Sequence, residues 1–345
     1  MRTLVTGANG HLGYNLVGAL LRAGHSVRAS VRTLADPART DHLRALGDVE
    51  LVEADVLQPT QLRAAMDGID VLYHAAAVYA YVSKGREQEI LDASLRGAEN
   101  ALRAAADARV RKVVMTSSAV TLPLTAPDAP PSDENDWTTD LRIPYMRAKT
   151  EGEQLAWRVA KEVGVHLVTI LPGGMLGPGF RRNTPSIAFV EMVMRGGLRM
   201  GVPDANFPAV DVRDVASVHL LAGERDCSGR FVATNDLPLP SLRTIAETLH
   251  RIDPSIRLPL MKMPTAMAPM LPFFDRLNHR LLGSPLVMTP EMIATFRGRI
   301  WNASNARAKR EFGWQPTVSL EDSLRDTVAT IRARDAQRKR TTASA

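Results

Sequence analysis

The sequence predicts an α/β protein in which a doubly wound parallel sheet is followed by a smaller, mostly helical C-terminal lobe. Through the first half of the chain, short apolar runs alternate with amphipathic stretches, which is the pattern of parallel strands joined by right-handed helical crossovers. The first apolar run ends in a glycine-rich turn at residues 7–13. A length of 345 residues also exceeds what one hydrophobic core usually serves, so two lobes are expected.

The elements follow one another at regular intervals after an N-terminal strand that ends at Thr6. Further strands are expected at residues 26–31, 49–54, 71–76, 112–117 and 166–171. The amphipathic stretches that predict helices cover residues 14–23, 59–66, 87–106 and 145–163. After Pro172 the rhythm changes, and the expected elements are a loop at 173–179, a helix at 185–195, short strands at 208–212 and 230–234, and a helix at 215–222.

Three glycines, Gly7, Gly10 and Gly13, follow the first strand at intervals of three. Gly7 permits a tight turn, Gly10 lets the backbone approach a pyrophosphate, and Gly13 lets the next helix lie close to the strand. The amides and the positive dipole end of that helix then face the anion. The turn therefore predicts a dinucleotide site, and the residues between its glycines that are expected to contact the cofactor are Asn9, His11 and Leu12. The spacing Gly-x-x-Gly-x-x-Gly differs from the Gly-x-Gly-x-x-Gly of the general fingerprint.

The change of rhythm after Pro172 also predicts where the lobes divide. Residues 1–172 are expected to form the dinucleotide-binding lobe, to which residues 208–235 return. The substrate-binding lobe comprises residues 173–207 and 236–331, and the basic end at 332–345 is expected to be a flexible tail. Four prolines between positions 259 and 272 argue against a long membrane-surface helix, so this apolar segment is expected to form a lid or a pocket wall.

Bulk composition narrows the classes of protein that the chain can be. The net charge of +6 results from 43 Lys and Arg against 37 Asp and Glu, and no aromatic residues interleave with the basic C-terminal residues, so no nucleic-acid partner is expected. The single Cys227 rules out an internal disulfide, and neither it nor the scattered histidines predict a metal site. The first strand starts directly after Met1 and Arg2, and no apolar run reaches the length of a membrane span. A cytoplasmic protein without a membrane span is expected.

A second pattern lies on the helix expected at 145–163. Tyr145 and Lys149 are four residues apart and share one helix face. The pKa of a phenol is about 10, and a neighbouring ammonium lowers it toward the range that is useful for proton exchange at neutral pH. Ser118 follows the strand expected at 112–117, at the carboxyl edge where open α/β sheets bind ligands. Tyr-x-x-x-Lys alone can be a surface pair, but after a nucleotide turn and a strand-end serine it predicts catalysis.

Residues 6–13 with Ser118, Tyr145 and Lys149 resemble the extended short-chain dehydrogenase/reductase family, within the superfamily of NAD-dependent epimerases and dehydratases. The similarity covers nearly the whole chain and implies a Rossmann-type first lobe. It also implies that Ser118 orients the substrate carbonyl, that Tyr145 is the general acid and base, and that Lys149 holds the nicotinamide ribose and tunes Tyr145. Further implied cofactor contacts are Asp55, Val56, Ala75, Ala76, Ala77, Pro172 and Gly173. The family commonly dimerises through two helices of the nucleotide lobe, so a homodimer is expected.

Two positions depart from the pattern of that family. The helix that often reads Asn-x-x-Gly-x-x-Asn has Ser94 in place of its first asparagine, while Asn100 keeps the last position. This puts a proton-relay role at position 94 in doubt. Ala148 stands where many relatives have a serine before the lysine.

The end of the second strand predicts which dinucleotide is bound. NAD-selective sites normally place an acid there to bind the ribose 2′-hydroxyl, whereas this chain has Arg32, with Arg39 as a second contact. A guanidinium matches a 2′-phosphate in charge and in its forked donors. NADP(H) is therefore the expected cofactor, and NAD(H) is the alternative.

The expected cofactor also helps to distinguish among the activities that the resemblance implies. Sugar-nucleotide epimerases and dehydratases mostly retain NAD, and dehydratases tend to carry an Asp-Glu pair beside the catalytic hydroxyl, which this chain lacks after Ser118. The runs around Arg32 and Ser118 look most like the dihydroflavonol-reductase-like branch, whose members reduce ketones and aldehydes with NADPH. The hypothesis is an NADPH-dependent carbonyl reductase that reversibly oxidises a secondary alcohol. Its small-molecule substrate is expected in an apolar pocket formed by Tyr79, Tyr81, Met175, Leu176, Phe180, Phe189 and Met192.

Two alternatives stay open. Arg181 and Arg182 are adjacent and can grip a diphosphate, which would suit a sugar-nucleotide epimerase or dehydratase. The other alternative is a non-catalytic dinucleotide-sensing protein on the same fold. Such proteins usually lose the tyrosine that this chain keeps at position 145.

Overall fold

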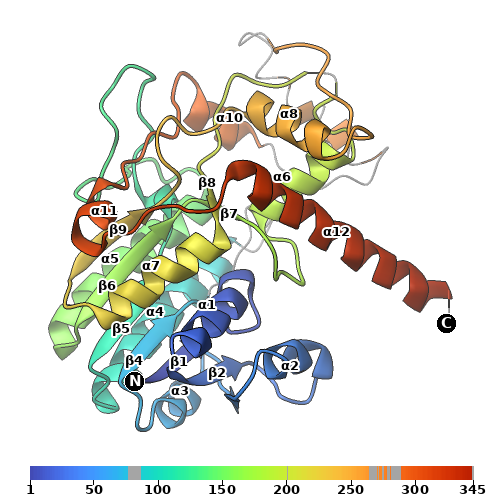
Figure 1. Cartoon of the computed structure of the whole chain (residues 1–345). Coiled ribbons are helices and arrows are strands. Elements are labelled where there is room, and N and C mark those ends of the chain that lie inside the picture. The colour runs from blue at the N-terminus through green and yellow to red at the C-terminus, as the bar shows by residue number, and fades with distance from the viewer. Residues whose placement is uncertain are drawn as a thin grey trace.

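The computed structural model describes residues 1–76, 87–199, 201–263 and 289–343, together with residues 270, 272, 273, 276, 277 and 280. A seven-stranded sheet forms the centre of the first lobe, and all its strand pairs are parallel (Figure 1). In spatial order its strands are β3 (Val49–Glu53), β2 (Ser26–Val31), β1 (Arg2–Thr6), β4 (Val71–His74), β5 (Lys112–Thr116), β6 (Leu167–Pro172) and β9 (Gly229–Ala233). The order reverses between β1 and β4, which creates the switch point where such sheets bind ligands. The predicted doubly wound sheet is confirmed.

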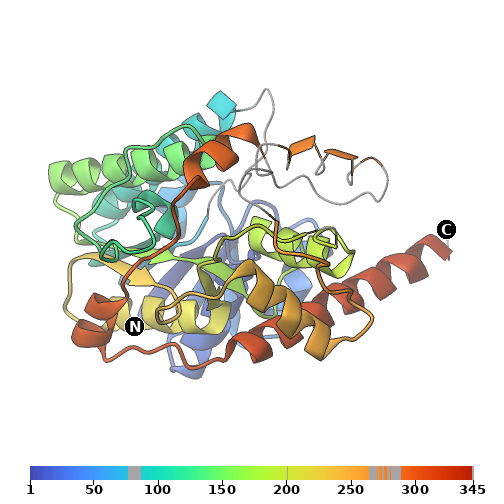
Figure 2. The ribbon, with the colours of Figure 1, turned by 90° about the horizontal axis from the view of Figure 1, so that it is seen from above.

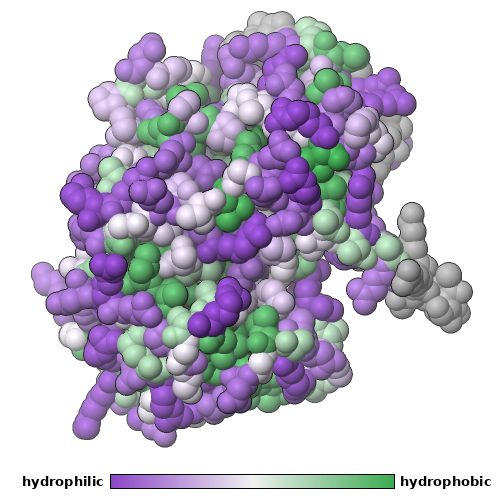
Figure 3. Space-filling model, in the orientation of Figure 1, coloured by the Kyte–Doolittle hydropathy of each residue, from purple (hydrophilic) through white to green (hydrophobic). Residues whose placement is uncertain are grey.

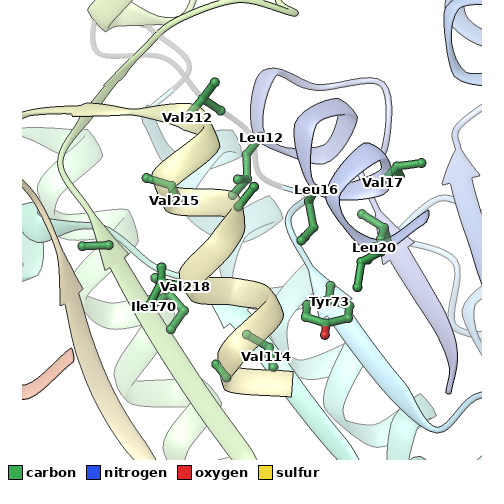
Figure 4. Packing of buried hydrophobic residues seen from close by; sticks show 14 of the residues in the cluster. Leu12, Leu16, Val17, Leu20, Tyr73, Val114, Ile170, Val212, Val215 and Val218 are labelled. Carbon is green, nitrogen blue, oxygen red and sulfur yellow. The ribbon is translucent and has the colours of Figure 1, made fainter. Parts of the chain in front are cut away.

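Helices cover both faces of this sheet, and Figure 2 shows α5 and α7 on opposite sides of it. The helices that pack on one face are α1 (His11–Arg22), α7 (Val212–Glu224) and α11 (Ala306–Phe312). Those on the other face are α3 (Pro59–Ala65), α4 (Glu87–Asp107) and α5 (Pro144–Val163). In Figure 4, leucines of α1 and valines of α7 meet above Tyr73, Val114 and Ile170 of the sheet. This burial fixes the N-terminus of α1 at the carboxyl edge of β1.

The second lobe is built mainly from three helices, α6 (Pro185–Met194), α8 (Leu242–Ile252) and α12 (Leu320–Ala343), which share one buried apolar cluster. Below them, β7 (Gly174–Leu176) and β8 (Ala209–Asp211) form a two-stranded parallel sheet. The sequence predicted a loop at the position of β7, whereas β8 lies within the strand expected at 208–212. The strands pair because Gly174 N donates to Pro208 O at 2.7 Å, and because Gly173 has no Cβ, which would lie 2.0 Å from Pro208 O. The remaining described elements are α2 (Pro37–Arg44), the short 3-10 helix η1 (Ala119–Thr121) and α10 (Pro290–Phe296).

The C-terminal end of the chain continues as helix. A flexible tail was expected from position 332, whereas α12 runs on to Ala343 and projects from the molecule (Figure 1). Ion pairs hold the start of this stretch, since Arg334 binds Glu191 at 3.2 Å and Arg332 binds Asp253. The part of α12 that leaves the second lobe is therefore anchored to α6 and to the end of α8.

Most of the large apolar side chains that are exposed in the described part of the chain belong to the second lobe. Hydrophobic residues are visible in its upper part in Figure 3. Between positions 258 and 277, around the four prolines noted above, the large exposed apolar residues are Leu258, Leu260, Met261, Met270, Phe273 and Leu277. The lid or pocket wall expected there stays a prediction. Among the residues that the structure describes, no helix is long and apolar enough to cross a membrane.

Candidate active site

The glycine turn has the geometry that its spacing predicts. Gly7 has a φ of +66°, and a Cβ on it would lie 2.8 Å from Ala76 Cα. Gly10 N donates to Gly7 O at 2.9 Å, which closes the turn directly before α1. A Cβ on Gly13 would lie 2.2 Å from Gly7 O, so the first turn of α1 can approach β1 only with glycine at this position. Because these glycines have no side chains, the N-terminus of α1 and the strand ends can lie close together.

The N-terminus of α1 fits the pyrophosphate of a dinucleotide. Within the described part of the chain no side chain caps this terminus, and no acidic residue lies in its first turn. The first amides of α1 are thus available to an anion. The His11 side chain turns away from them, since Nε2 donates to Pro178 O at 3.1 Å and the ring meets Phe180 edge-on at 5.4 Å. Burial lowers the pKa of His11 to about 4, so this side chain is neutral at pH 7.

The residues expected around the adenosine half lie at the ends of β2 and β3. Arg32 is exposed directly after β2, whereas Arg39 binds Asp36 at 2.8 Å. Asp55 follows β3, and its Oδ1 accepts from Leu57 N at 2.9 Å. Val56 O accepts from Asn100 Nδ2 at 3.0 Å, so α4 fixes this loop. Arg32 is therefore the more available of the two predicted arginines.

Other predicted cofactor contacts lie along the same edge of the sheet. Ala75 and Ala76 follow β4, where Ala76 N donates to Thr6 Oγ1 at 3.3 Å. Pro172 ends β6, and Gly173 N donates to Ala233 O at 3.1 Å. Three predicted residues lie outside the described part of the chain, namely Ala77, Tyr79 and Tyr81.

Lys149 lies at the carboxyl end of β5. The side chain is buried, at 9% exposure, and Nζ donates to Thr116 O at 3.5 Å. Burial lowers the pKa of Lys149 to about 8, against the opposing effect of the Glu153 carboxylate. Ser118 follows two residues after Thr116, and its Oγ accepts from Val120 N at 3.3 Å at the start of η1. The lysine and the serine are thus brought to one strand end.

Tyr145 reaches the same region from the first turn of α5. It is 2% exposed and shares a buried cluster with Val120 of η1 and Trp301. Packing of α5 against η1 therefore brings the phenol toward the strand end that carries Ser118. Tyr145 and Lys149 both lie on α5, which confirms the predicted helix and the placement of the two residues one turn apart on it.

Two buried histidines flank this strand end. His74 Nδ1 lies 3.0 Å from Thr6 Oγ1, and burial together with the Lys149 ammonium lowers the pKa of His74 to about 4. His219 Nδ1 lies 2.8 Å from Val215 O and its Nε2 2.9 Å from Thr116 Oγ1. Since a helical carbonyl only accepts, His219 donates from Nδ1 and accepts the threonine proton at Nε2. Burial lowers the pKa of His219 to about 4, so both rings are neutral at pH 7.

Sequence reasoning missed a buried ion pair beside these residues. Glu153 and Arg230 are 0% and 6% exposed, and Arg230 Nε donates to Glu153 Oε1 at 3.0 Å. Glu153 lies one turn after Lys149 on the same face of α5, which was the available signal. Arg230 is a charged residue at the start of a buried strand, which was the second signal.

The predicted substrate residues of the second lobe lie in different surroundings. Met175 is half-buried on β7. Phe180 and Phe189 are 3% and 8% exposed and pack in the apolar cluster of the second lobe, where Phe189 stacks on Phe207 at 5.1 Å. Their role in a substrate pocket stays a prediction. Across the described residues, no group of three or more His, Cys, Asp or Glu side chains is arranged to hold a metal ion.

Comparison with known proteins agrees with this geometry. The model of the NAD dependent epimerase/dehydratase family matches residues 3–232. Cinnamoyl-CoA reductase CAD2 of Medicago truncatula is 31% identical over 272 residues, which cover 74% of this chain and 82% of that protein. Sterol demethylase protein B of Methylococcus capsulatus is 32% identical over 346 residues, which cover 97% and 99%. The solved structure of gox2253 aligns with a TM-score of 0.81 at 25% identity and covers 96% of this chain and 98% of that one.

Proposed function

The chain belongs to the NAD-dependent epimerase/dehydratase family, of the extended short-chain dehydrogenase/reductase type, and is an NAD(P)-dependent oxidoreductase; we propose that it reduces a ketone or aldehyde on a mainly apolar substrate with NADPH. One observation carries the proposal. Lys149 Nζ reaches Thr116 O at 3.5 Å, two residues before Ser118, from the helix face that also carries Tyr145. A buried hydroxyl, phenol and ammonium at one strand end suit proton transfer to a carbonyl oxygen.

Each of the three side chains has a distinct task in this proposal. Ser118 donates a hydrogen bond to the substrate oxygen, and Tyr145 delivers the proton to that oxygen. The Lys149 ammonium lowers the pKa of the Tyr145 phenol and contacts the ribose of the nicotinamide. With a pKa of about 8, Lys149 keeps its charge at pH 7. Bound NADPH supplies the hydride. In the reverse direction, Tyr145 takes the proton from an alcohol.

NADPH is proposed over NADH because of Arg32. This exposed guanidinium follows β2, where NAD-selective sites place an acid. The Gly7–Gly13 turn would hold the pyrophosphate, and the loop at Asp55 and Val56 would lie against the adenine. These residues fit a dinucleotide, since the bare N-terminus of α1 offers amides to an anion.

An apolar substrate is supported by two lines of reasoning. The names of the two relatives refer to cinnamoyl-CoA, whose cinnamoyl group is apolar although its coenzyme A part is polar, and to a sterol, which is bulky and apolar. The second lobe also contains a large buried apolar cluster, and we propose this lobe, formed by residues 173–207 and 236–331, as the substrate lobe. The alternative, a sugar-nucleotide epimerase or dehydratase, is favoured by Arg181 and Arg182, which are exposed after Phe180.

A substrate panel separates these functions. Aryl ketones, aldehydes, steroids and nucleotide sugars are offered while NADPH and NADH consumption are followed separately. Consumption of NADPH with an apolar ketone or aldehyde is expected. Turnover of a nucleotide sugar without net consumption, by protein that copurifies with a non-exchanging nicotinamide, would instead establish the epimerase.

The proposed acid is tested by Tyr145→Phe. General acid catalysis contributes about 100- to 10,000-fold, so turnover should fall by at least about 100-fold while the Kd of NADPH changes little. Tyr73→Phe is the matched control, because Tyr73 is also buried but its hydroxyl has no hydrogen-bond partner among the described residues. Wild-type turnover in Tyr145→Phe would disprove the mechanism.

We also propose that the protein is a cytoplasmic homodimer that pairs through two helices of the first lobe, as is common in the family. Light scattering after size-exclusion chromatography tests the dimer, and a monomer at micromolar concentration would refute it.

A further inference from the structure

The buried pair Glu153 and Arg230 joins most of the elements that carry the proposed active site. Glu153 Oε2 accepts from Ser117 Oγ at 2.7 Å, and Oε1 accepts from Thr169 Oγ1 at 2.6 Å and from Arg230 Nε at 3.0 Å. One carboxylate on α5 therefore binds side chains of β6 and β9 and of the residue that directly precedes Ser118. All four hydrogen-bonding side chains are buried or nearly so.

Arg230 extends the connection to the chain that follows η1. Its Nη1 donates to Glu134 O at 2.9 Å and to Asp136 O at 2.7 Å, and its Nη2 donates to Thr121 Oγ1 at 2.8 Å. The guanidinium also lies 3.6 Å from the centre of the Trp137 ring. The side chain of Arg230 thus has a partner for each of its three nitrogens, which fixes its position and that of Glu153.

Stability alone is a poor reason for this arrangement. Removing two charges from water costs several kcal/mol for each ion, and well-packed apolar residues of similar volume often stabilise a protein as well or better. The pair instead lies where geometry matters for chemistry. Glu153 is one helical turn from Lys149 and accepts a hydrogen bond from Ser117, the residue directly before Ser118. We propose that Glu153 and Arg230 are positioning residues, which hold the catalytic serine and lysine in register and supply the counter-charge of the lysine.

This inference rests on the proposed function, but its electrostatic part does not require turnover. The charged and titratable groups around Lys149 are Tyr145 and Glu153 on its own helix, His74 on β4, His219 on α7, Arg230 on β9 and Glu134 in the loop bound by Arg230. Both histidines are neutral at pH 7, so Glu153 is the nearby anion that opposes the loss of the Lys149 proton. Removing this charge lowers the apparent pKa values of the Tyr145–Lys149 pair.

The test compares Glu153→Gln with the double variant Glu153→Gln/Arg230→Gln. In Glu153→Gln we expect kcat to fall about 10- to 100-fold, because small misplacements of catalytic groups have effects of this size, while the Kd of NADPH stays within about threefold. The high-pH limb of reductase activity should move about one pH unit lower. The double variant removes both charges, so the high-pH limb of its activity should return toward that of the wild type, while its kcat stays low. It also keeps the test valid if the lone buried guanidinium of Glu153→Gln prevents folding.

Glu162→Gln is the matched control, because Glu162 lies on the same helix but is exposed and pairs with Arg103 at 3.0 Å. This variant should keep wild-type kcat and pH profile. NMR of lysine labelled with carbon-13 at Cε follows the titration of Lys149 without any substrate, with Lys149→Met to assign its signal. If the wild type shows no reductase activity, the proposed function is refuted. A lower titration midpoint of Lys149 in Glu153→Gln would then still support the role of Glu153 as the counter-charge of the lysine. An unchanged midpoint together with wild-type kcat in Glu153→Gln would overturn the inference.

Discussion

Replacement of Gly13 by alanine probes the contact on which the cofactor site depends. The added Cβ would lie 2.2 Å from Gly7 O, 2.8 Å from Ala8 Cα and 2.9 Å from Gly7 C. All three atoms belong to the backbone of the turn, so no side chain can rotate to relieve the overlap. The first turn of α1 and the end of β1 must move apart instead.

The size of the effect follows from these distances. A methyl carbon and a carbonyl oxygen need a separation of about 3 Å or more, so the turn and the helix must separate by roughly 1 Å. Overpacking of this kind costs about 1–3 kcal/mol of folding free energy. The same shift moves the α1 amides relative to a bound pyrophosphate, and we expect the Kd of NADPH to rise about 10- to 100-fold, which is about 1.4–2.8 kcal/mol.

Gly18→Ala is the control within the same helix. Its Cβ would meet only Arg22 Nη1 at 3.2 Å and Leu46 Cδ2 at 3.7 Å, both at the far ends of side chains that can move. Alanine also favours a helix over glycine by about 1 kcal/mol, so this variant should be as stable as the wild type or more stable. Urea unfolding and NADPH fluorescence titration measure both quantities. Wild-type stability and wild-type NADPH affinity in Gly13→Ala would refute the reasoning.

Two further predictions concern charge. Arg32→Asp should weaken NADPH binding about 10- to 100-fold, because a charge-assisted hydrogen bond to the 2′-phosphate is worth about 1.5–3 kcal/mol. NADH binding should weaken little. Equal losses of affinity for both cofactors, measured by titration, would contradict the 2′-phosphate contact. Burial lowers the pKa of His11, His74 and His219 to about 4. Below pH 6.5 the unfolded chain therefore binds more protons than the folded protein. The folding stability present at pH 7 is lost as the pH falls from 6.5 toward 4. Urea unfolding at pH 7 and pH 5 should differ by about 2 kcal/mol for each histidine, and equal stability at both values would show that these rings titrate normally.

The first lobe could be predicted closely because its signals are local. The strand expected at 112–117 is β5 (Lys112–Thr116), and the helix expected at 145–163 is α5 (Pro144–Val163). Buried parallel strands are continuous apolar runs, and the crossover helices are amphipathic, so each element is visible within its own residues. The polar α2 was missed, although Asp36 caps it and Pro37 occupies its first position, which together predict a helix start.

What the sequence could not provide is contact between distant segments. β7 and β8 are three residues long, and their pairing depends on Gly173 and Pro208, which lie far apart in the chain. Arg230 and Glu153 are 77 positions apart, and no local pattern links them. Tyr145 and Lys149 could be proposed as catalytic residues from the sequence because they are one helical turn apart, so that their relation is itself local.

The two departures from the family pattern have a common physical cause in the contact between α4 and α5. Ala148 is 3% exposed and packs in an apolar cluster with Ile90 and Leu91 of α4, where a serine hydroxyl would be buried among apolar side chains. Ser94 lies against Gly152, whose Cβ would be 3.4 Å from Ser94 Oγ. Positions 148 and 152 form one stripe of α5 that faces α4, whereas 145, 149 and 153 form the stripe that faces the strand ends. Small residues on the first stripe permit close helix packing, so both substitutions are explained by packing. The residues of α5 that take part in the proposed chemistry all lie on the second stripe.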